Sequence, residues 1–314
     1  MQGLTAHHLR FQVQALEPIS FGNQPGSAIR GALYQALSRH FCSEPDDPQT
    51  PDHQSRCPVC WLLAAEDPQG DRGHTIPRAM TVQPPLTSEF DTDEVLTFGI
   101  TLIGRAQDLM LYLVRAVQMM GHTGIGRGRG KFRLTGLAEY SPLLDAERKL
   151  LDGNTIRQPT LHINDPRIEE CSRNIPDDHV TLEFITPLRL TRDKRLLKSP
   201  EPEPFAQRLI ERCQALVTYY AEPAGGPERE AWKEASRSLT AQAARLAVAC
   251  DETKWVEMWS GSRRQQRYTP ISGLVGVVRW EGDVSGLKTW LLWGQSLHVG
   301  KNAVKGNGWY RIVS

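Results

Sequence analysis

Apolar residues alternate with polar ones at the start of the chain and then recur at helical spacing. The alternation predicts a strand over 4–16. The helical spacing predicts a helix that follows Pro25-Gly26 and has Ser27 as its N-cap. The apolar stripe of this helix consists of Ile29, Leu33, Leu37 and Phe41.

The rest of the first half continues these patterns. Apolar residues share one helical face over 106–120, which predicts a second helix with Gly121 as its stop. The stretch 42–75 is rich in Pro, Asp and Gly, which is typical of an inserted loop. Further strands are expected over 76–83, 95–103 and 131–140. This β-α-β-β-α-β order predicts a ferredoxin-like domain.

The order restarts after 143–178, a mixed and polar stretch that we interpret as a connection. Helices are expected over 205–220, 230–250 and 287–297. Strands are expected over 180–190, 255–259, 271–280 and 309–313. The sequence therefore predicts the α+β class with tandem ferredoxin-like (RRM-like) domains. The first covers 1–142, with a cysteine-containing insertion at about 42–75, and the second covers 179–314.

Each predicted domain ends with a helix, a glycine-rich basic loop and a strand. The first loop reads Gly-His-Thr-Gly-Ile-Gly-Arg-Gly-Arg-Gly-Lys-Phe-Arg over 121–133, and the second occupies 300–308. Gly130-Lys131-Phe132-Arg133 matches Gly308-Trp309-Tyr310-Arg311 in character, which indicates an internal duplication. Glycine lets the backbone approach a phosphate while basic side chains bind its oxygens. Neither loop has the spacing of a nucleotide-binding motif.

Charge is segregated along the chain. The net charge is +1, so binding of nucleic acid has to depend on local basic patches. The predicted RNA-binding side chains come from the two loops and from a basic connection at 262–267. They are Arg127, Arg129, Lys131, Arg263, Arg264, Arg267, Lys301 and Lys305. The aromatic residues Phe132, Trp309 and Tyr310 lie beside them and are open to two interpretations, base stacking or core packing.

Three of the six cysteines are clustered in the predicted insertion. Cys42, Cys57 and Cys60 have a Cys-x-x-Cys pair among them, which resembles a zinc knuckle. A fourth ligand is not fixed by the spacing, and His53 and His74 both qualify. A zinc ion here would fold the insertion, whereas a cluster of reduced thiols is the alternative. No apolar run is long enough to span a membrane, so a cytoplasmic location is expected.

Four stretches together resemble the CRISPR-associated endoribonucleases that cut precursor repeat RNA, members of the RAMP (repeat-associated mysterious protein) superfamily. They are Gly-Ser-Ala-Ile-Arg-Gly-Ala-Leu at 26–33, the glycine loop at 124–132, Phe-Ile-Thr-Pro-Leu-Arg-Leu at 184–190 and the loop at 300–308. The resemblance implies repeat RNA as the partner and cleavage without a metal or other catalytic cofactor. It implies attack by the 2′-OH on the neighbouring phosphate, leaving a 2′,3′-cyclic phosphate and a 5′-hydroxyl.

The resemblance also implies a catalytic histidine on or just after the first helix, where this chain has His40. Tyr34, on the same helix, would orient RNA or phosphate. From the residues alone, a packed or capping His40 and a core Tyr34 stay open. His122 and His298 open the two loops and compete as catalytic histidines, whereas His7 and His8 are expected on the surface of the first strand.

Two other functions also fit the sequence. One is a non-catalytic RNA-binding subunit of a CRISPR effector complex, with other effector subunits as partners. The other is a zinc-stabilised RNA-binding protein outside CRISPR biology, which leaves the duplication unexplained. No membrane partner is expected.

Overall fold

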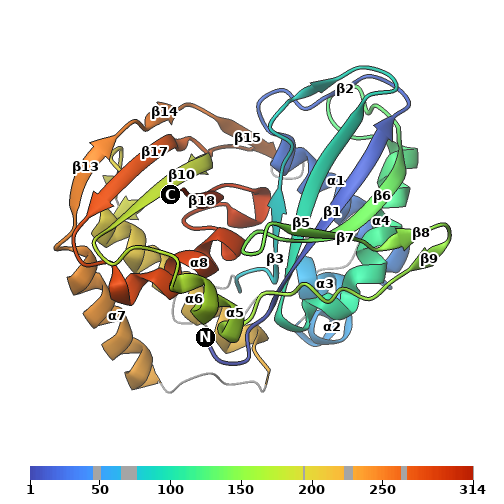
Figure 1. Ribbon diagram of the computed structural model, residues 1–314. Helices are drawn as coiled ribbons and strands as arrows, with labels where there is room; N and C mark the ends of the chain where they lie inside the picture. The colour runs from blue at the N-terminus through green and yellow to red at the C-terminus, as the bar shows by residue number, and fades with distance from the viewer. Residues whose placement is uncertain (45–50, 65–75, 194, 223–228, 263–266, 314) are drawn as a thin grey trace. The chain divides into compact units, whose positions relative to one another are not determined.

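The computed structural model describes residues 1–44, 51–64, 76–193, 195–222, 229–262 and 267–313 (Figure 1). The chain forms two compact units. The N-terminal unit comprises His7–Ser141 and Glu147–His162. The C-terminal unit comprises Met1–Ala6, Pro142–Ala146 and Ile163–Ser314. No helix in the described ranges is long and apolar enough to cross a membrane.

The N-terminal unit contains a five-stranded sheet with the strand order β3-β5-β1-β6-β7. Its elements are β1 (Ala6–Ala15), β2 (Ile19–Ser20), α1 (Pro25–Phe41), α2 (Pro51–Arg56), α3 (Pro58–Leu63), β3 (Met80–Gln83), β4 (Glu89–Phe90), β5 (Val95–Ile103), the 3-10 helix η1 (Gly104–Leu109), α4 (Met110–Thr123), β6 (Phe132–Ser141), β7 (Ala146–Lys149), β8 (Leu151–Asp152) and β9 (Thr155–Ile156). The first four strands of this order reproduce the ferredoxin-like arrangement, with β7 added at one edge.

Helices α1 and α4 lie together on one side of this sheet (Figure 1). Their apolar stripes supply Leu33, Leu37, Leu113 and Val117, all fully buried. Phe11 of β1 stacks on Phe98 of β5 with 5.3 Å between ring centroids. The sheet and the two helices thus enclose one apolar core, as the periodicity of the sequence predicts.

The C-terminal unit repeats this architecture with the strand order β13-β17-β10-β18. Its elements are α5 (Asp165–Ser172), β10 (His179–Leu188), β11 (Thr191–Arg192), β12 (Arg195–Leu196), α6 (Pro202–Tyr220), α7 (Arg229–Ala243), β13 (Ala247–Asp251), β14 (Lys254–Val256), β15 (Trp259–Ser262), β16 (Arg267–Pro270), β17 (Gly273–Glu281), η2 (Ser285–Leu287), α8 (Lys288–Leu297), η3 (Ala303–Lys305) and β18 (Tyr310–Val313). The tandem ferredoxin-like α+β fold predicted from the sequence is therefore confirmed.

Aromatic side chains form the centre of this second core. Phe205 of α6 lies 6.0 Å from Phe184, 5.2 Å from Trp280 and 5.4 Å from Tyr310, measured between ring centroids. These three partners come from β10, β17 and β18, so one helical residue ties three strands together. Burial of such large side chains is the main favourable term in folding.

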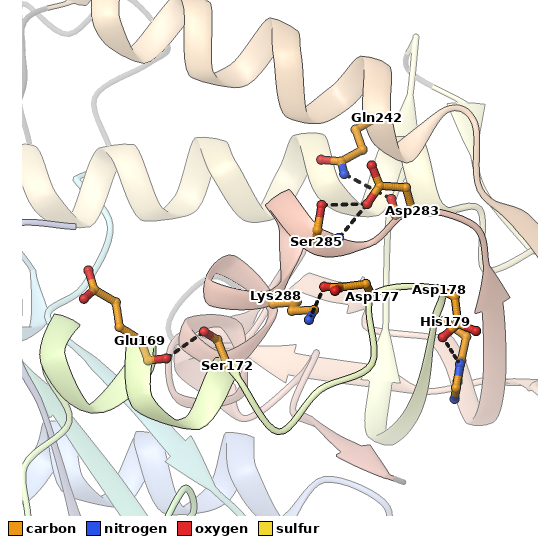
Figure 2. Close-up of polar contacts among 9 residues, drawn as sticks. All are labelled: Glu169, Ser172, Asp177, Asp178, His179, Gln242, Asp283, Ser285 and Lys288. Atoms are coloured by element: carbon orange, nitrogen blue, oxygen red, sulfur yellow. Dashed lines mark hydrogen bonds and ion pairs between the residues drawn. The ribbon is translucent and has the colours of Figure 1, made fainter.

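Polar contacts fix the start of α8 (Figure 2). Asp283 accepts hydrogen bonds from the Ser285 backbone N–H at 3.0 Å and from its hydroxyl at 2.6 Å. Lys288 pairs with Asp177, which precedes β10. This ion pair gives Lys288 a structural role.

Four local predictions are wrong. Helix α1 begins at Pro25, with Gln24 as N-cap, because proline favours the first helical turn; Ser27 is therefore inside the helix. Gly121 does not end α4, which continues to Thr123. A Cβ on Gly121 would lie 2.3 Å from the Phe132 carbonyl oxygen, so glycine is needed there for close packing. The predicted loop 42–75 contains α2 and α3, and the helix predicted over 230–250 ends at Ala243, before β13.

His7 and His8 are buried rather than on the surface. His7 stacks on His162 with 5.2 Å between centroids, and the Nδ1 of His8 lies 2.8 Å from the Thr101 hydroxyl oxygen. Burial, helped by nearby positive charge, lowers the pKa of His7 to about 4 and that of His8 to about 3. Both histidines are therefore neutral in the folded protein at neutral pH.

This burial predicts acid-sensitive stability. Between about pH 6.5 and pH 4 the unfolded chain binds protons that the folded chain does not, so stability falls as pH falls. Each histidine contributes a slope of about 1.4 kcal/mol per pH unit. We expect urea unfolding between pH 7.5 and 5 to show this loss, and H8N to reduce its slope by about one proton. H122N, at an exposed histidine, serves as the control. Equal slopes in wild type and H8N would contradict the assignment.

Candidate functional site

The first glycine loop is closed by a backbone hydrogen bond. The Ile125 N–H donates to the Gly130 carbonyl at 3.0 Å, and the Arg127 N–H donates to the Ser20 carbonyl at 2.6 Å. Gly124 has φ +76° and ψ 156°, a conformation available almost only to glycine. Its missing side chain also matters, because a Cβ there would lie 1.9 Å from the Arg129 carbonyl oxygen. The glycines thus allow a tight loop that holds its arginines outward.

Three predicted RNA-binding residues of this loop are exposed, but they differ in their surroundings. The Arg127 guanidinium lies against Gly22, just before α1, and the Arg129 Nε donates to the Thr123 carbonyl at 3.2 Å. Lys131 forms an ion pair with Glu17 at 3.2 Å, and hydrogen bonds from Lys131 lower the pKa of Glu17. Lys131 is therefore partly neutralised, whereas the two arginines present their full charge to solvent.

The second glycine loop repeats the closure with a longer span. The Val299 N–H donates to the Gly308 carbonyl at 3.0 Å, and a Cβ on Gly308 would lie 1.8 Å from the Val299 carbonyl oxygen. Lys301 is exposed and Lys305 is half-buried. The Lys301 backbone N–H donates to the Arg189 carbonyl at 3.1 Å, which ties the loop to the segment that follows β10.

Two polar residues that the sequence analysis did not single out hold this second loop in place. The Thr186 hydroxyl donates to the Gly306 carbonyl at 2.7 Å and accepts from the Trp309 N–H at 2.9 Å. The Asn307 side-chain amide donates to the Ile271 carbonyl at 2.9 Å. Thr186 lies within the stretch 184–190 that resembles the family. A polar residue at the buried end of a predicted strand was the signal from which its role in holding the loop could have been found.

Phe132, Tyr310 and His298 are buried and do not offer faces to a ligand. Phe132 and Tyr310 are buried in the two cores, so base stacking by them is excluded and the core interpretation holds. His298 is completely buried and stacks on the half-buried Trp309, with 6.3 Å between centroids. His298 is therefore wrongly placed for approaching a phosphate, whereas His122 is exposed.

His40 lies in the last turn of α1 and is exposed. The open alternative of a packed histidine is therefore wrong, because the helix turns this position toward solvent. Phe41 beside it packs edge-on against Tyr112 of α4, at 5.2 Å between centroids, which ties the end of α1 to α4. Tyr34 is half-buried, and the Arg30 guanidinium lies 5.7 Å from its ring centroid.

His40 and the first glycine loop lie near opposite ends of α1. Arg127 contacts Gly22 just before the helix, whereas His40 is the next-to-last residue of the helix. A helix of 17 residues is about 25 Å long. Groups around Arg127 and His40 therefore reach separate parts of any bound molecule.

The three clustered cysteines come together with His53. The side-chain ligand atoms of Cys42, His53, Cys57 and Cys60 all lie within 4.8 Å of one another, an arrangement that fits a metal ion. Burial and the two neighbouring thiols raise the pKa of Cys60. Of the two histidines that the spacing left open, His53 takes the fourth position, and His74 lies outside the described residues. Arg263 and Arg264 also lie outside them, and only the backbone of Arg267 is described, at the start of β16.

Two family models match the chain. A model named AF_1859_N, an N-terminal domain, matches residues 4–161, and the model of the CRISPR-associated endoribonuclease Cas6 matches residues 182–310. A search of the curated proteins found no match to this sequence.

Solved structures share the fold at low sequence identity. The Cas6 (TTHB231) product complex, whose protein is from Thermus thermophilus, is 15% identical with a TM-score of 0.60, covering 98% of this chain and 100% of that one. The Cas6 (TTHA0078) product complex is 15% identical with a TM-score of 0.57, covering 99% and 100%. A partial Cas6-RT-Cas1–Cas2 complex is 11% identical with a TM-score of 0.61, covering 99% of this chain and 46% of that one.

The loop geometry predicts different costs for two glycine substitutions. G128A and G124A both place alanine at positive φ, which costs about 1–2 kcal/mol. No atom lies within 4 Å of a Cβ at Gly128, whereas a Cβ at Gly124 meets a backbone carbonyl. We expect urea unfolding to show a loss of about 1 kcal/mol for G128A and a clearly larger loss for G124A. Equal losses would contradict the close approach at Gly124.

Proposed function

Because the chain belongs to the RAMP-type proteins of CRISPR precursor-RNA processing, and its second half matches the Cas6 endoribonuclease model, we propose that it cuts CRISPR repeat RNA without a catalytic metal. One observation carries the proposal beyond the family. His40 is held at a fixed helix end and is exposed there, which is what a group that exchanges protons with RNA requires.

The proposed reaction uses the RNA's own 2′-hydroxyl as nucleophile. His40 removes the 2′ proton as the oxygen attacks the adjacent phosphorus, and the bond from phosphorus to the 5′-oxygen breaks. The leaving 5′-oxygen takes its proton from a general acid, either a side chain or water, so the products are a 2′,3′-cyclic phosphate and a 5′-hydroxyl. Tyr34, six residues before His40 on the same helix, would orient the RNA backbone rather than exchange protons.

Exposed cations of each unit would bind the phosphates of the RNA. In the N-terminal unit Arg127 and Arg129 suit this role better than Lys131, because Glu17 competes for the lysine. In the C-terminal unit Lys301 is the exposed member of the pair Lys301 and Lys305. Each phosphate contact releases counterions, so the affinity should depend on salt.

The partners follow from the same proposal. The named complexes of similar structures contain a product in two cases and the Cas1 and Cas2 proteins in another. We infer that repeat RNA and its cleaved product are the ligands of this chain, and that other CRISPR proteins are further partners. Tight binding without cleavage would instead support a non-catalytic RNA-binding subunit.

The catalytic role of His40 predicts a selective loss of rate. H40A should lower the single-turnover rate of repeat-RNA cleavage by about 10²–10⁴-fold, the usual contribution of a general acid or base, and leave RNA affinity nearly unchanged. The assay contains EDTA and protein in excess over RNA. H179A, at a partly exposed histidine of the C-terminal unit, is the control. Full activity of H40A together with an inactive H122A would move the catalytic role to His122.

The separation along α1 predicts that the loop arginines affect binding and not the chemical step. The double variant R127A/R129A should weaken RNA binding and flatten the plot of log affinity against log salt by about 0.7–0.9 for each lost phosphate contact. Its cleavage rate at saturating protein should stay within about twofold of wild type. The length of α1, about 25 Å, separates these arginines from His40, so neither should reach the reacting phosphate. R237A, at an exposed arginine paired with Glu234, is the control. A rate loss as large as that of H40A would contradict the separation.

A further inference from the structure

We propose that Cys42, His53, Cys57 and Cys60 form a closed tetrahedral zinc site that fixes the last turn of α1, and with it His40, to the α2–α3 segment. The zinc site is inferred from the geometry of these four residues alone and does not require the proposed cleavage function. The effect on His40 rests on the function proposed above.

The distances among Cys42, His53 and Cys60 match a tetrahedron around a metal ion, and the Cys57 sulfur lies within 4.8 Å of the other ligand atoms. Bonds of about 2.3 Å to sulfur and about 2.0 Å to nitrogen place two sulfurs about 3.8 Å apart, and a sulfur and a nitrogen about 3.5 Å apart. The sulfurs of Cys42 and Cys60 are 3.8 Å apart, and each lies 3.4 Å from the Nε2 of His53. A disulfide requires about 2.05 Å between two sulfurs, much less than the 3.8 Å between Cys42 and Cys60. A disulfide would also not explain why the third thiol and the imidazole lie in the same cluster.

The ligand chemistry selects zinc and a structural role. Three thiolates and one imidazole are soft ligands that favour zinc over magnesium or calcium. Four protein ligands leave no open position for water or RNA, so this metal would take no part in the cleavage step. The Nδ1 of His53 lies 3.5 Å from a Glu44 carboxylate oxygen, the outer partner that orients many metal-bound histidines.

The site joins three segments at the end of α1. Cys42 is the C-cap of that helix, its backbone N–H donates to the Ser38 carbonyl at 3.3 Å, and its extended backbone leads the chain away. His53 belongs to α2, Cys57 is the N-cap of α3, and Cys60 lies in the first turn of α3. The Cys57 N–H donates to the His53 carbonyl at 2.8 Å, which fixes these two ligands relative to each other.

Helix α3 is packed against the same unit at other points. Val59, Leu62 and Leu63 are buried, and the Arg30 guanidinium of α1 donates to the Leu63 carbonyl at 3.4 Å. Arg30 therefore links α1 to one end of α3, and the zinc ligands link α1 to the other. A helix end without such a tie frays easily, because its last carbonyls lack intrahelical partners.

His40 precedes the ligand Cys42 by two residues. Loss of the metal should loosen the last turn of α1, and a displacement of about 1 Å in a catalytic group can cost on the order of 10²-fold in rate. RNA affinity should change little, because the loop arginines lie near the other end of the helix.

The first test is the metal content and the coordination geometry of the full chain. We expect zinc near one equivalent per chain in wild type, in H53C, which keeps four ligands, and in C250S, whose thiol is exposed and remote in sequence. C42S should lose most of its zinc and unfold at lower temperature. Cobalt in place of zinc should give the visible spectrum of a tetrahedral site with sulfur ligands. Wild type without zinc and without this cobalt spectrum would overturn the site.

The second test compares cleavage, binding and zinc content on the same samples. C42S should cut repeat RNA on the order of 10²-fold more slowly at saturating protein, with near-normal RNA affinity, whereas H53C should recover most of the rate. A folded C42S that lacks zinc and cuts at the wild-type rate would overturn the link to His40. Wild type that holds one zinc and binds RNA but does not cut would refute the proposed function and leave the zinc site standing.

Discussion

A backbone approach that only glycine permits closes the loop after the second ferredoxin helix of each unit. In one loop the Gly124 Cα faces the Arg129 carbonyl, and in the other the Gly308 Cα faces the Val299 carbonyl, with room for no side chain. Each loop is closed by one N–H to carbonyl bond at 3.0 Å, from Ile125 to Gly130 and from Val299 to Gly308. The exposure of the loop cations depends on this closure, and its repetition is strong structural evidence for the duplication.

Much of the fold could be predicted from the sequence because side-chain periodicity reports which face is buried. The strand order follows from the order of elements once the ferredoxin-like pattern is recognised. Contacts distant in sequence could not be predicted. Gly121 looks like a helix stop, yet it is needed because Phe132 packs on it, and His7 looks like a surface residue, yet it stacks on His162.

The candidate site was predictable in its residue types and less so in its geometry. Cys-x-x-Cys spacing indicated a metal site, but only the fold could choose His53, since α2 brings it to the cysteines. The loop arginines were predictable as exposed cations, whereas the ion pair that weakens Lys131 involves Glu17, which is 114 residues away. Tertiary contacts of this kind decide which charges remain available to RNA. The roles of His40, Tyr34 and the basic residues stay predictions.

Single-turnover cleavage of repeat RNA that carries one 2′-deoxy nucleotide at the cut position, in EDTA, tests the proposed mechanism most directly. We expect no cleavage there, because the attacking hydroxyl is missing, and an affinity close to that of the unmodified RNA. The unmodified RNA should be cut under the same conditions and leave a 2′,3′-cyclic phosphate. Cleavage of the deoxy substrate at that position, or cleavage only when magnesium is added, would contradict the proposed mechanism.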